Sequence, residues 1–161
     1  MKRLLAVLII LSSFVMFMAC DEDSGNGTND DDDQKAWVGT WLSTGTNVAP
    51  ILVTVFTYDS VRVTIGSDMT VKTESHVKDG AWTSVEGVYT VTESESGDVH
   101  AVEFVYAAFS QAGIMQVTGD NMQLEVVQTI PDIGATPRTP DTGFGSDAAL
   151  GVLNIQKYVR Q

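Results

Sequence analysis

Few side chains in the sequence could act as a nucleophile, a general base or a metal ligand. Cys20 is the only cysteine, and His76 and His100 are the only histidines. Each histidine stands alone in an alternating pattern of apolar and polar residues, without a second ligand at the spacing that zinc motifs use. We interpret both as ordinary strand residues, and the sequence predicts neither an enzyme nor a resident cofactor or metal.

The residues before Cys20 have the order of a secretory signal. Lys2 and Arg3 give a positive start, and residues 4–19 are apolar except for two serines. This apolar segment is shorter than the roughly 20 residues that a helix needs to cross a bilayer. Residues 1–19 are therefore predicted to be a signal peptide that is removed. Ordinary secretory cleavage at the same place and an uncut anchor helix remain as alternatives.

The segment Phe17-Met18-Ala19-Cys20 resembles the lipobox of bacterial lipoproteins, in which a small residue precedes a lipidated cysteine. The resemblance implies that the thiol of Cys20 carries diacylglycerol and that the protein gains acyl chains such as palmitate. More than one acyl chain is enough for stable attachment to a membrane. The expected location is the bacterial cell envelope, on the outer membrane or cell surface rather than the inner membrane.

An acidic spacer follows the cysteine. Residues 20–33 carry seven carboxylates and no basic side chain. Such a segment cannot bury enough apolar surface to offset its ordering entropy, so we predict a disordered tether. The run Asp30 to Asp33 lacks the ligand spacing and the glycine turn of a calcium-binding loop and is interpreted as a solvated spacer.

The remaining residues, 34–161, are enough for one domain with a sizeable core. They carry 14 acidic and 7 basic residues, hence a net charge of −7 with both histidines neutral. Nucleic acids and anionic lipids attract basic patches, so neither is an expected partner. The membrane would be contacted through the lipid on Cys20.

Alternation of apolar and polar residues predicts that this domain is all-β. The turn signals between the runs are too short to hold crossover helices, so neighbouring strands should be antiparallel. About eight to ten up-and-down strands avoid exposed edges best by closing into a barrel, with two stacked sheets as the alternative. The predicted strands are 37–44, 51–57, 61–65, 69–77, 81–85, 88–92, 99–106, 113–118, 122–129 and 149–159.

The tripeptide Gly39-Thr40-Trp41 resembles the Gly-x-Trp signature that opens the first strand of lipocalins, members of the calycin group of β-barrels. The resemblance implies a lipocalin-like barrel over residues 34–161. It also implies that Trp41 closes the barrel floor against a basic residue near the chain end, a place that Arg160 occupies. A guanidinium over an indole is worth about 0.5 to 2 kcal/mol. The alternative is an ordinary core tryptophan with Arg160 at a frayed terminus.

Function depends on whether the barrel is open or filled, since eight strands suffice for either one small ligand or a side-chain core. The leading prediction is a membrane-anchored module that binds a small hydrophobic or amphipathic ligand. Candidate lining residues are Phe56, Tyr89, Phe104 and Tyr106, although aromatic residues in such positions more often belong to a plain core.

The alternative is a structural or interaction lipoprotein of the envelope with a filled barrel. A protein partner would then contact an outer strand face or the long loop 130–147, which contains three prolines. Gly143-Phe144-Gly145-Ser146 within that loop lacks the lysine and the helix of a phosphate-binding loop and is interpreted as a turn.

Overall fold

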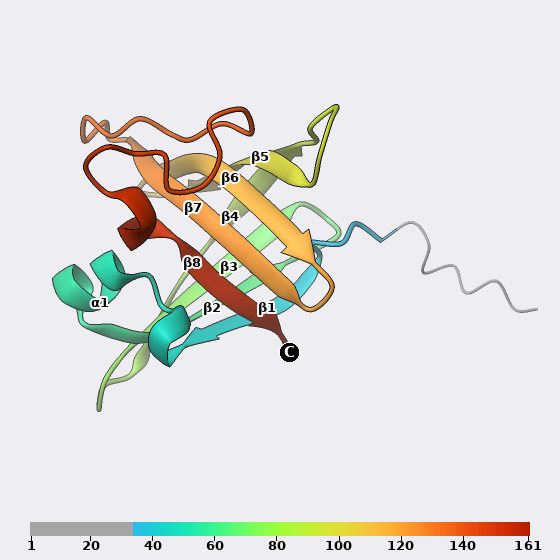
Figure 1. The fold of residues 1–161 in the computed structure, drawn as a ribbon. Helices are drawn as coiled ribbons and strands as arrows, with labels where there is room; N and C mark the ends of the chain where they lie inside the picture. Colours follow the sequence, from blue (N-terminus) through green and yellow to red (C-terminus); the bar gives the residue numbers. More distant parts are fainter. Residues whose placement is uncertain (1–33) are drawn as a thin grey trace, which may run out of the picture. The chain divides into compact units, whose positions relative to one another are not determined.

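Eight antiparallel strands close into a barrel in the computed structural model, which describes residues 34–161 (Figure 1). Sequential strands are neighbours throughout, and the last strand pairs with the first, so the prediction of an all-β, up-and-down, closed barrel is confirmed. The strands are β1 (Gly39–Thr44), β2 (Tyr58–Ile65), β3 (Thr70–Val77), β4 (Trp82–Thr92), β5 (Val99–Tyr106), β6 (Ser110–Thr118), β7 (Asn121–Ile130) and β8 (Gln156–Arg160). Two single-turn 3-10 helices, η2 (Gly45–Asn47) and η3 (Gly151–Asn154), and one short helix, α1 (Pro50–Phe56), complete it.

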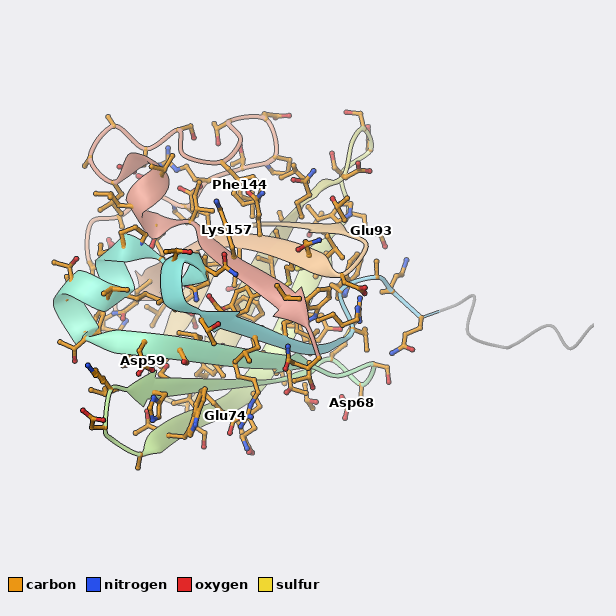
Figure 2. All side chains as sticks on the ribbon, turned by 60° about the horizontal axis from the view of Figure 1, so that its bottom comes forward. Asp59, Asp68, Glu74, Glu93, Phe144 and Lys157 are labelled. Atoms are coloured by element: carbon orange, nitrogen blue, oxygen red, sulfur yellow. The ribbon has the colours of Figure 1, made fainter. Side chains whose placement is uncertain are left out.

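The alternation of residue types places one face of each strand inside the barrel. On β2, Val61, Val63 and Ile65 are buried, whereas Arg62 between them pairs with Glu74 on β3. Charged side chains such as Glu74 and Lys157 lie on the outside (Figure 2). All eight strand pairs lie within residues 34–161, so this part of the chain contains every contact that closes the sheet. The predicted signal peptide, Cys20 and the acidic tether lie outside the described residues.

Residues 51–57, predicted to be a strand, instead form helix α1. Pro50 stands at the first helical position, where its missing N–H is not needed and its fixed φ favours the helix. The helix ends at Thr57, which has a left-handed φ of 57°. The β-branched content of this segment misled the prediction, because tertiary context overrides local propensity in so short an element.

Two predicted strands, 81–85 and 88–92, are one continuous strand, β4. The predicted strands leave out residues 86 and 87, but Gly87 lies within the ladder opposite Tyr106. A Cβ at this position would overlap the backbone oxygen of Val105 on β5, so only glycine permits the close approach. The last predicted strand, 149–159, is also shorter than expected, because η3 precedes β8.

The two ends of the barrel differ. One end carries the connections between β2 and β3 and between β6 and β7, together with residues 34–38 and the C-terminus. The other end carries α1 and η3, and the segment 131–150 starts from this end and crosses the outer face of the sheet over β5–β7 before it returns to η3 (Figure 1). We call the first the floor and the second the open end.

Candidate functional site

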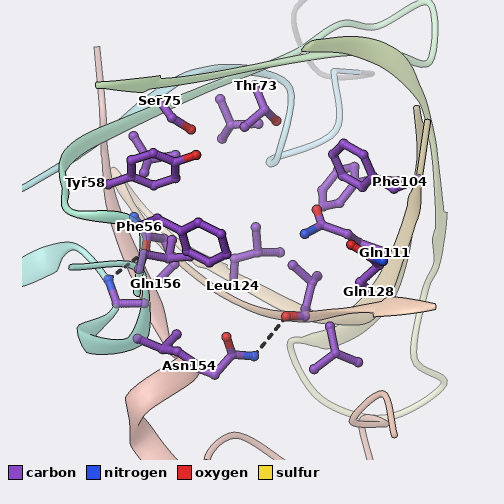
Figure 3. A pocket seen from close by; sticks show the side chains of 18 of the residues that line it. Phe56, Tyr58, Thr73, Ser75, Phe104, Gln111, Leu124, Gln128, Asn154 and Gln156 are labelled. Atoms are coloured by element: carbon purple, nitrogen blue, oxygen red, sulfur yellow. Dashed lines mark hydrogen bonds between the residues drawn. The ribbon is translucent and has the colours of Figure 1, made fainter. Parts of the chain in front are cut away.

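A cavity of about 410 Å³ lies inside the barrel toward the open end. Ligand pockets for small molecules usually measure about 300 to 1,000 Å³. Every strand except β1 contributes to its wall, and α1, η3 and the segment 131–150 contribute around its entrance (Figure 3).

The cavity wall is apolar and aromatic and contains no charged side chain among the described residues. Its aromatic rings come from α1, β2, β5, the turn after β5 and β8: Phe56, Tyr58, Phe104, Tyr106, Phe109 and Tyr158. Burying an ion without an opposite charge is expensive, whereas burying apolar surface is favourable by about 25 cal/mol per Å². The site therefore suits an uncharged molecule with a large apolar part.

Uncharged polar side chains also line the cavity: Thr73, Ser75, Thr83, Ser84, Gln111, Gln128, Asn154 and Gln156. Gln156 is 4% exposed, and its Oε1 accepts a hydrogen bond of 2.7 Å from the backbone N–H of Ala49. Its Nε2 has no partner. The hydroxyl of Ser43 is the other buried polar side-chain atom without a partner in the described part of the chain, but Ser43 does not line the cavity. Gln156 lines the cavity, but its unpaired Nε2 has essentially no accessible surface and so does not face the open space of the cavity.

Two tyrosines of the wall, Tyr106 and Tyr158, are held in their neutral form. The hydroxyls of Tyr106 and Thr73 are 2.8 Å apart. Burial raises the pKa of Tyr106 above its ordinary value. Burial also raises the pKa of Tyr158, and the nearby Tyr106 raises it further. These phenols therefore offer neutral hydrogen-bonding groups rather than charges.

The raised pKa values of Tyr106 and Tyr158 predict a loss of stability in alkali. The unfolded chain releases these protons near the ordinary pKa of 10.0, before the folded chain does. The free energy of unfolding should therefore be highest below about pH 10 and fall as the pH rises, by at most about 1.4 kcal/mol per pH unit for each tyrosine. Urea unfolding of the wild type and of Tyr158→Phe at several pH values measures this, and an equal alkaline decline in both would contradict the assignment.

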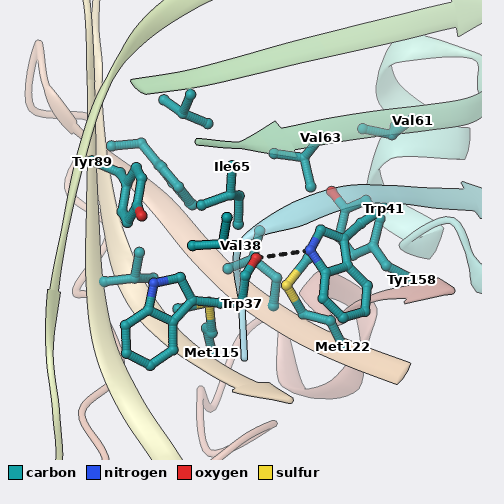
Figure 4. Packing of buried hydrophobic residues seen from close by; sticks show 14 of the residues in the cluster. Trp37, Val38, Trp41, Val61, Val63, Ile65, Tyr89, Met115, Met122 and Tyr158 are labelled. Carbon is teal, nitrogen blue, oxygen red and sulfur yellow. Dashed lines mark hydrogen bonds between the residues drawn. The ribbon is translucent and has the colours of Figure 1, made fainter. Parts of the chain in front are cut away.

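At the floor, Arg160 packs over Trp41. The guanidinium carbon is 4.1 Å from the centroid of the indole, which is fully buried. Nη1 of Arg160 donates to the backbone oxygen of Val38 over 2.8 Å, and Nη2 donates to that of Ala36 over 2.6 Å. The indole N–H of Trp41 donates to the backbone oxygen of Trp37 over 2.9 Å (Figure 4). The segment before β1 is thereby tied across the end of the barrel.

Gly39 explains the spacing of the Gly-x-Trp tripeptide. Its φ is 138°, a conformation that side-chain-bearing residues rarely adopt. A Cβ there would lie 2.6 Å from Nη1 of Arg160. The glycine therefore makes room for the guanidinium that covers Trp41 two residues later.

Three of the four predicted lining residues line the cavity, and Tyr89 does not. Phe56, Phe104 and Tyr106 line the cavity, although Phe56 does so from α1 and is 51% exposed. Tyr89 does not line the cavity: it is 7% exposed, and its hydroxyl donates to the backbone oxygen of Gly66 at the floor end. The three residues that line the cavity belong to its entrance and one wall.

The two histidines have different surroundings. Nδ1 of His76 lies 2.7 Å from a carboxylate oxygen of Asp59, and this hydrogen bond raises the pKa of His76. His100 lies edge-on to Trp37, with ring centroids 5.5 Å apart. Within residues 34–161, no group of three or more His, Cys, Asp or Glu side chains gathers as a metal site would require.

The candidate lining residues named from the sequence are all aromatic, and Gln156 is not among them. A signal was present: Gln156, Tyr158 and Arg160 are two residues apart and share one face of β8. Once Arg160 is placed inside the barrel, Gln156 must also face inward.

Comparison with known proteins adds no relative. No known family model matches the sequence, and no curated protein or solved structure is detectably similar to it. What the structure establishes is a closed, eight-stranded, antiparallel barrel, which is compatible with a lipocalin-like fold. No helix in the described part of the chain is long and apolar enough to span a membrane.

Proposed function

We propose that this protein is a binding module that holds a small, uncharged, largely apolar molecule inside its barrel. The observation that carries the proposal is the cavity of about 410 Å³ with its uncharged wall. We further propose that lipid on Cys20 attaches the module to a membrane of the bacterial envelope. The order of residues 1–20 supports this second part, together with the acidic spacer that follows.

The entrance to the cavity supports the same function. Helix α1 lies at the open end, and Leu52 and Phe56 from this helix face the cavity. Val55 of the same helix is 63% exposed, and Ile133 in the segment opposite is 63% exposed. An apolar rim lowers the free-energy cost for an apolar molecule to enter the barrel, because contact with the rim reduces the apolar surface that the molecule exposes to water during entry.

A structural or protein-interaction role in the envelope is the second candidate. Exposed apolar side chains on α1 and η3, such as Val55 and Val152, are the observation that favours it, because such patches often mark contact surfaces. The structural role suggested by the sequence requires a barrel filled with side chains, however, and the cavity does not fit that requirement. We therefore rank ligand binding first.

Blocking the cavity should weaken binding. Val126 on β7 lines the cavity, and replacing it with tryptophan puts an indole where a ligand would lie. Losing the burial of only two methylene equivalents costs about 1.6 kcal/mol, so Val126→Trp should bind N-phenyl-naphthylamine, an uncharged fluorescent probe, at least about tenfold more weakly. Fluorescence titration of the soluble domain, residues 34–161, measures this.

Val105→Trp is the matched control for this experiment. Val105 lies on β5 between the inward-facing Phe104 and Tyr106 and is 43% exposed on the outer face. The same substitution there should leave probe affinity unchanged. Equal weakening in both variants, or none in either, would place the probe outside the barrel and count against the proposal.

A further inference from the structure

Helix α1 is apolar on its outward face as well as on the face that it turns to the cavity. Leu52 and Phe56 line the cavity. Val53 and Val55 do not line it, and both are exposed. A helix at a protein surface normally turns polar residues outward, and a helix that is apolar all round is normally buried. In the described part of the chain, nothing buries the outward face of α1.

The neighbours of α1 extend this apolar surface. Helices α1 and η3 lie against each other at the open end (Figure 1). Val152 and Leu153 of η3 are exposed, as is Ile133 at the cavity entrance. We call this surface the apolar tip and define it by its exposed side chains: Val53, Val55, Phe56, Ile133, Val152 and Leu153. Exposed apolar patches commonly mark a site of contact with a protein or a membrane.

The chain segments that form most of the apolar tip are uncharged. Residues 36–58 and 148–156 contain no Asp, Glu, Lys or Arg. The charges that border the tip in sequence at Asp59 and Asp132 are acidic. Anionic lipids attract basic patches, and the tip offers none. The tip therefore suits a neutral, apolar environment rather than a charged surface.

A bilayer fits the tip better than a second copy of the domain does. Two copies would each carry a net charge of −7 over residues 34–161. A stable protein–protein interface takes about 20 to 30 residues from each partner, whereas the tip has six exposed apolar side chains. A bilayer needs no matching shape, and an apolar helix face enters it by about 5 to 10 Å at the boundary of headgroups and acyl chains.

The chain between Cys20 and the barrel is long enough for the open end to reach the membrane. Residues 20–33 can span at most about 46 to 50 Å, at roughly 3.3 to 3.6 Å per residue. The longest strand, β4, has 11 residues. At roughly 3.3 Å per residue and the usual tilt of about 35 to 45°, the barrel is about 26 to 30 Å tall. A lipid on Cys20 therefore leaves the open end free to face the bilayer, although the chain enters the barrel at the floor.

We propose that the apolar tip docks on a lipid bilayer, with α1 and η3 inserted among the headgroups and the cavity entrance facing the membrane. Apolar contact holds the tip there, so a neutral bilayer is sufficient. This inference goes beyond the proposed ligand binding. It uses the proposed lipid on Cys20 only as the means that keeps the domain close to the membrane.

Fluorescence quenching by lipids tests the docking. Residues 21–161, which contain the whole closed barrel, are held by an N-terminal hexahistidine tag on phosphatidylcholine vesicles with nickel-chelating lipid. The tag replaces the lipid of Cys20, and this part of the chain has no cysteine, so Val55→Cys carries the dye NBD at a single position. Insertion by about 5 to 10 Å puts the dye at the depth of a doxyl group near the headgroups. Vesicles with doxyl lipid should therefore show at most about half the fluorescence of vesicles without it.

Val159→Cys is the matched control. Val159 is also an exposed valine and alternates with the inward-facing Tyr158, so it lies on the outer face of β8 near the floor. Because the tagged end of the chain joins the barrel at the floor, tethering alone would bring position 159 at least as close to the membrane as position 55. The dye at position 159 should nevertheless show little quenching.

The double substitution Val152→Asp and Leu153→Asp tests the apolar contact itself. Neither residue lines the cavity. Two carboxylates on η3 would have to be buried without an opposite charge on docking, so quenching of the dye at position 55 should disappear. An unchanged urea midpoint shows that the double variant is folded, without reference to any ligand.

The outcomes separate this inference from the proposed function. Absence of quenching at position 55, equal quenching at positions 55 and 159, or quenching that persists in the folded double variant would overturn the docking. A requirement for anionic lipid such as phosphatidylglycerol would overturn the apolar contact. A blue shift of the dye at position 55 that grows with protein concentration without vesicles would assign the tip to a second copy instead. None of these results depends on an occupied cavity or on lipidation of Cys20, which have their own tests.

Discussion

Replacing Trp41 with alanine is expected to lower the free energy of unfolding by about 3 to 5 kcal/mol, the usual cost of removing a large buried aromatic side chain. The indole is fully buried, donates to the backbone of Trp37 and lies under the guanidinium of Arg160. Its loss leaves a hole in the floor and removes the surface on which Arg160 packs. Urea unfolding of residues 34–161 measures the effect.

Trp82→Ala is the control for this prediction. Trp82 is 41% exposed at the start of β4, with the guanidinium carbon of Arg62 4.9 Å from its ring centroid. An exposed contact of this kind is worth about 0.5 to 1 kcal/mol, so Trp82→Ala should cost far less than Trp41→Ala. A cost below about 1 kcal/mol for Trp41→Ala would show that the floor does not depend on this residue.

Replacing Cys20 with serine is expected to abolish lipidation of the full chain. In bacterial lipoproteins, whose lipobox residues 17–20 resemble, diacylglycerol is attached to the cysteine thiol, and a serine hydroxyl does not replace that thiol. Without acyl chains, each of whose buried methylenes contributes about 0.8 kcal/mol, stable attachment through lipid is lost. Incorporation of an alkyne-bearing palmitate into the protein should fall to background, and the mass of the protein should show altered processing of residues 1–19.

Ser24→Ala in the acidic spacer is the control, since it changes a nearby small polar residue without touching the thiol. It should be labelled and processed as the wild type is. If Cys20→Ser is labelled and processed like the wild type, the lipoprotein interpretation is wrong, and ordinary secretion or an uncut anchor takes its place.

The barrel could be predicted from the sequence because its strands follow simple alternation. Val61, Val63 and Ile65 mark one buried face of β2 so clearly that a shift of one residue would expose all three. The short turns between strands left little choice but antiparallel neighbours. Closure then followed from the need to avoid exposed edges, and the pairing of β1 with β8 provides it.

The open end was harder to predict, because its elements depend on tertiary contacts. Residues 50–56 are rich in valine and threonine, yet they form α1, which packs over the cavity entrance. The place of Tyr89 could not be settled either, since alternation shows which residues share a face but not toward which end of the barrel a side chain extends. Tyr89 lies directly opposite Phe104 on the neighbouring strand, but its hydroxyl extends to the backbone oxygen of Gly66 at the floor end.

The polar character of the cavity also escaped sequence reasoning. A glutamine on an alternating strand is ordinarily assigned to the solvent face, and only the inward position of its neighbours on β8 reveals Gln156. Its unpaired donor depends on the contact with Ala49, 107 residues away in the chain. No local pattern encodes a contact of that range.

Native mass spectrometry of residues 34–161, produced in the organism that makes the protein and purified without detergent, tests most directly whether the barrel holds a ligand. We expect a reproducible excess mass that disappears on denaturation and belongs to a small uncharged molecule. A bare protein mass, unchanged after incubation with a lipid extract of the same organism, would contradict it.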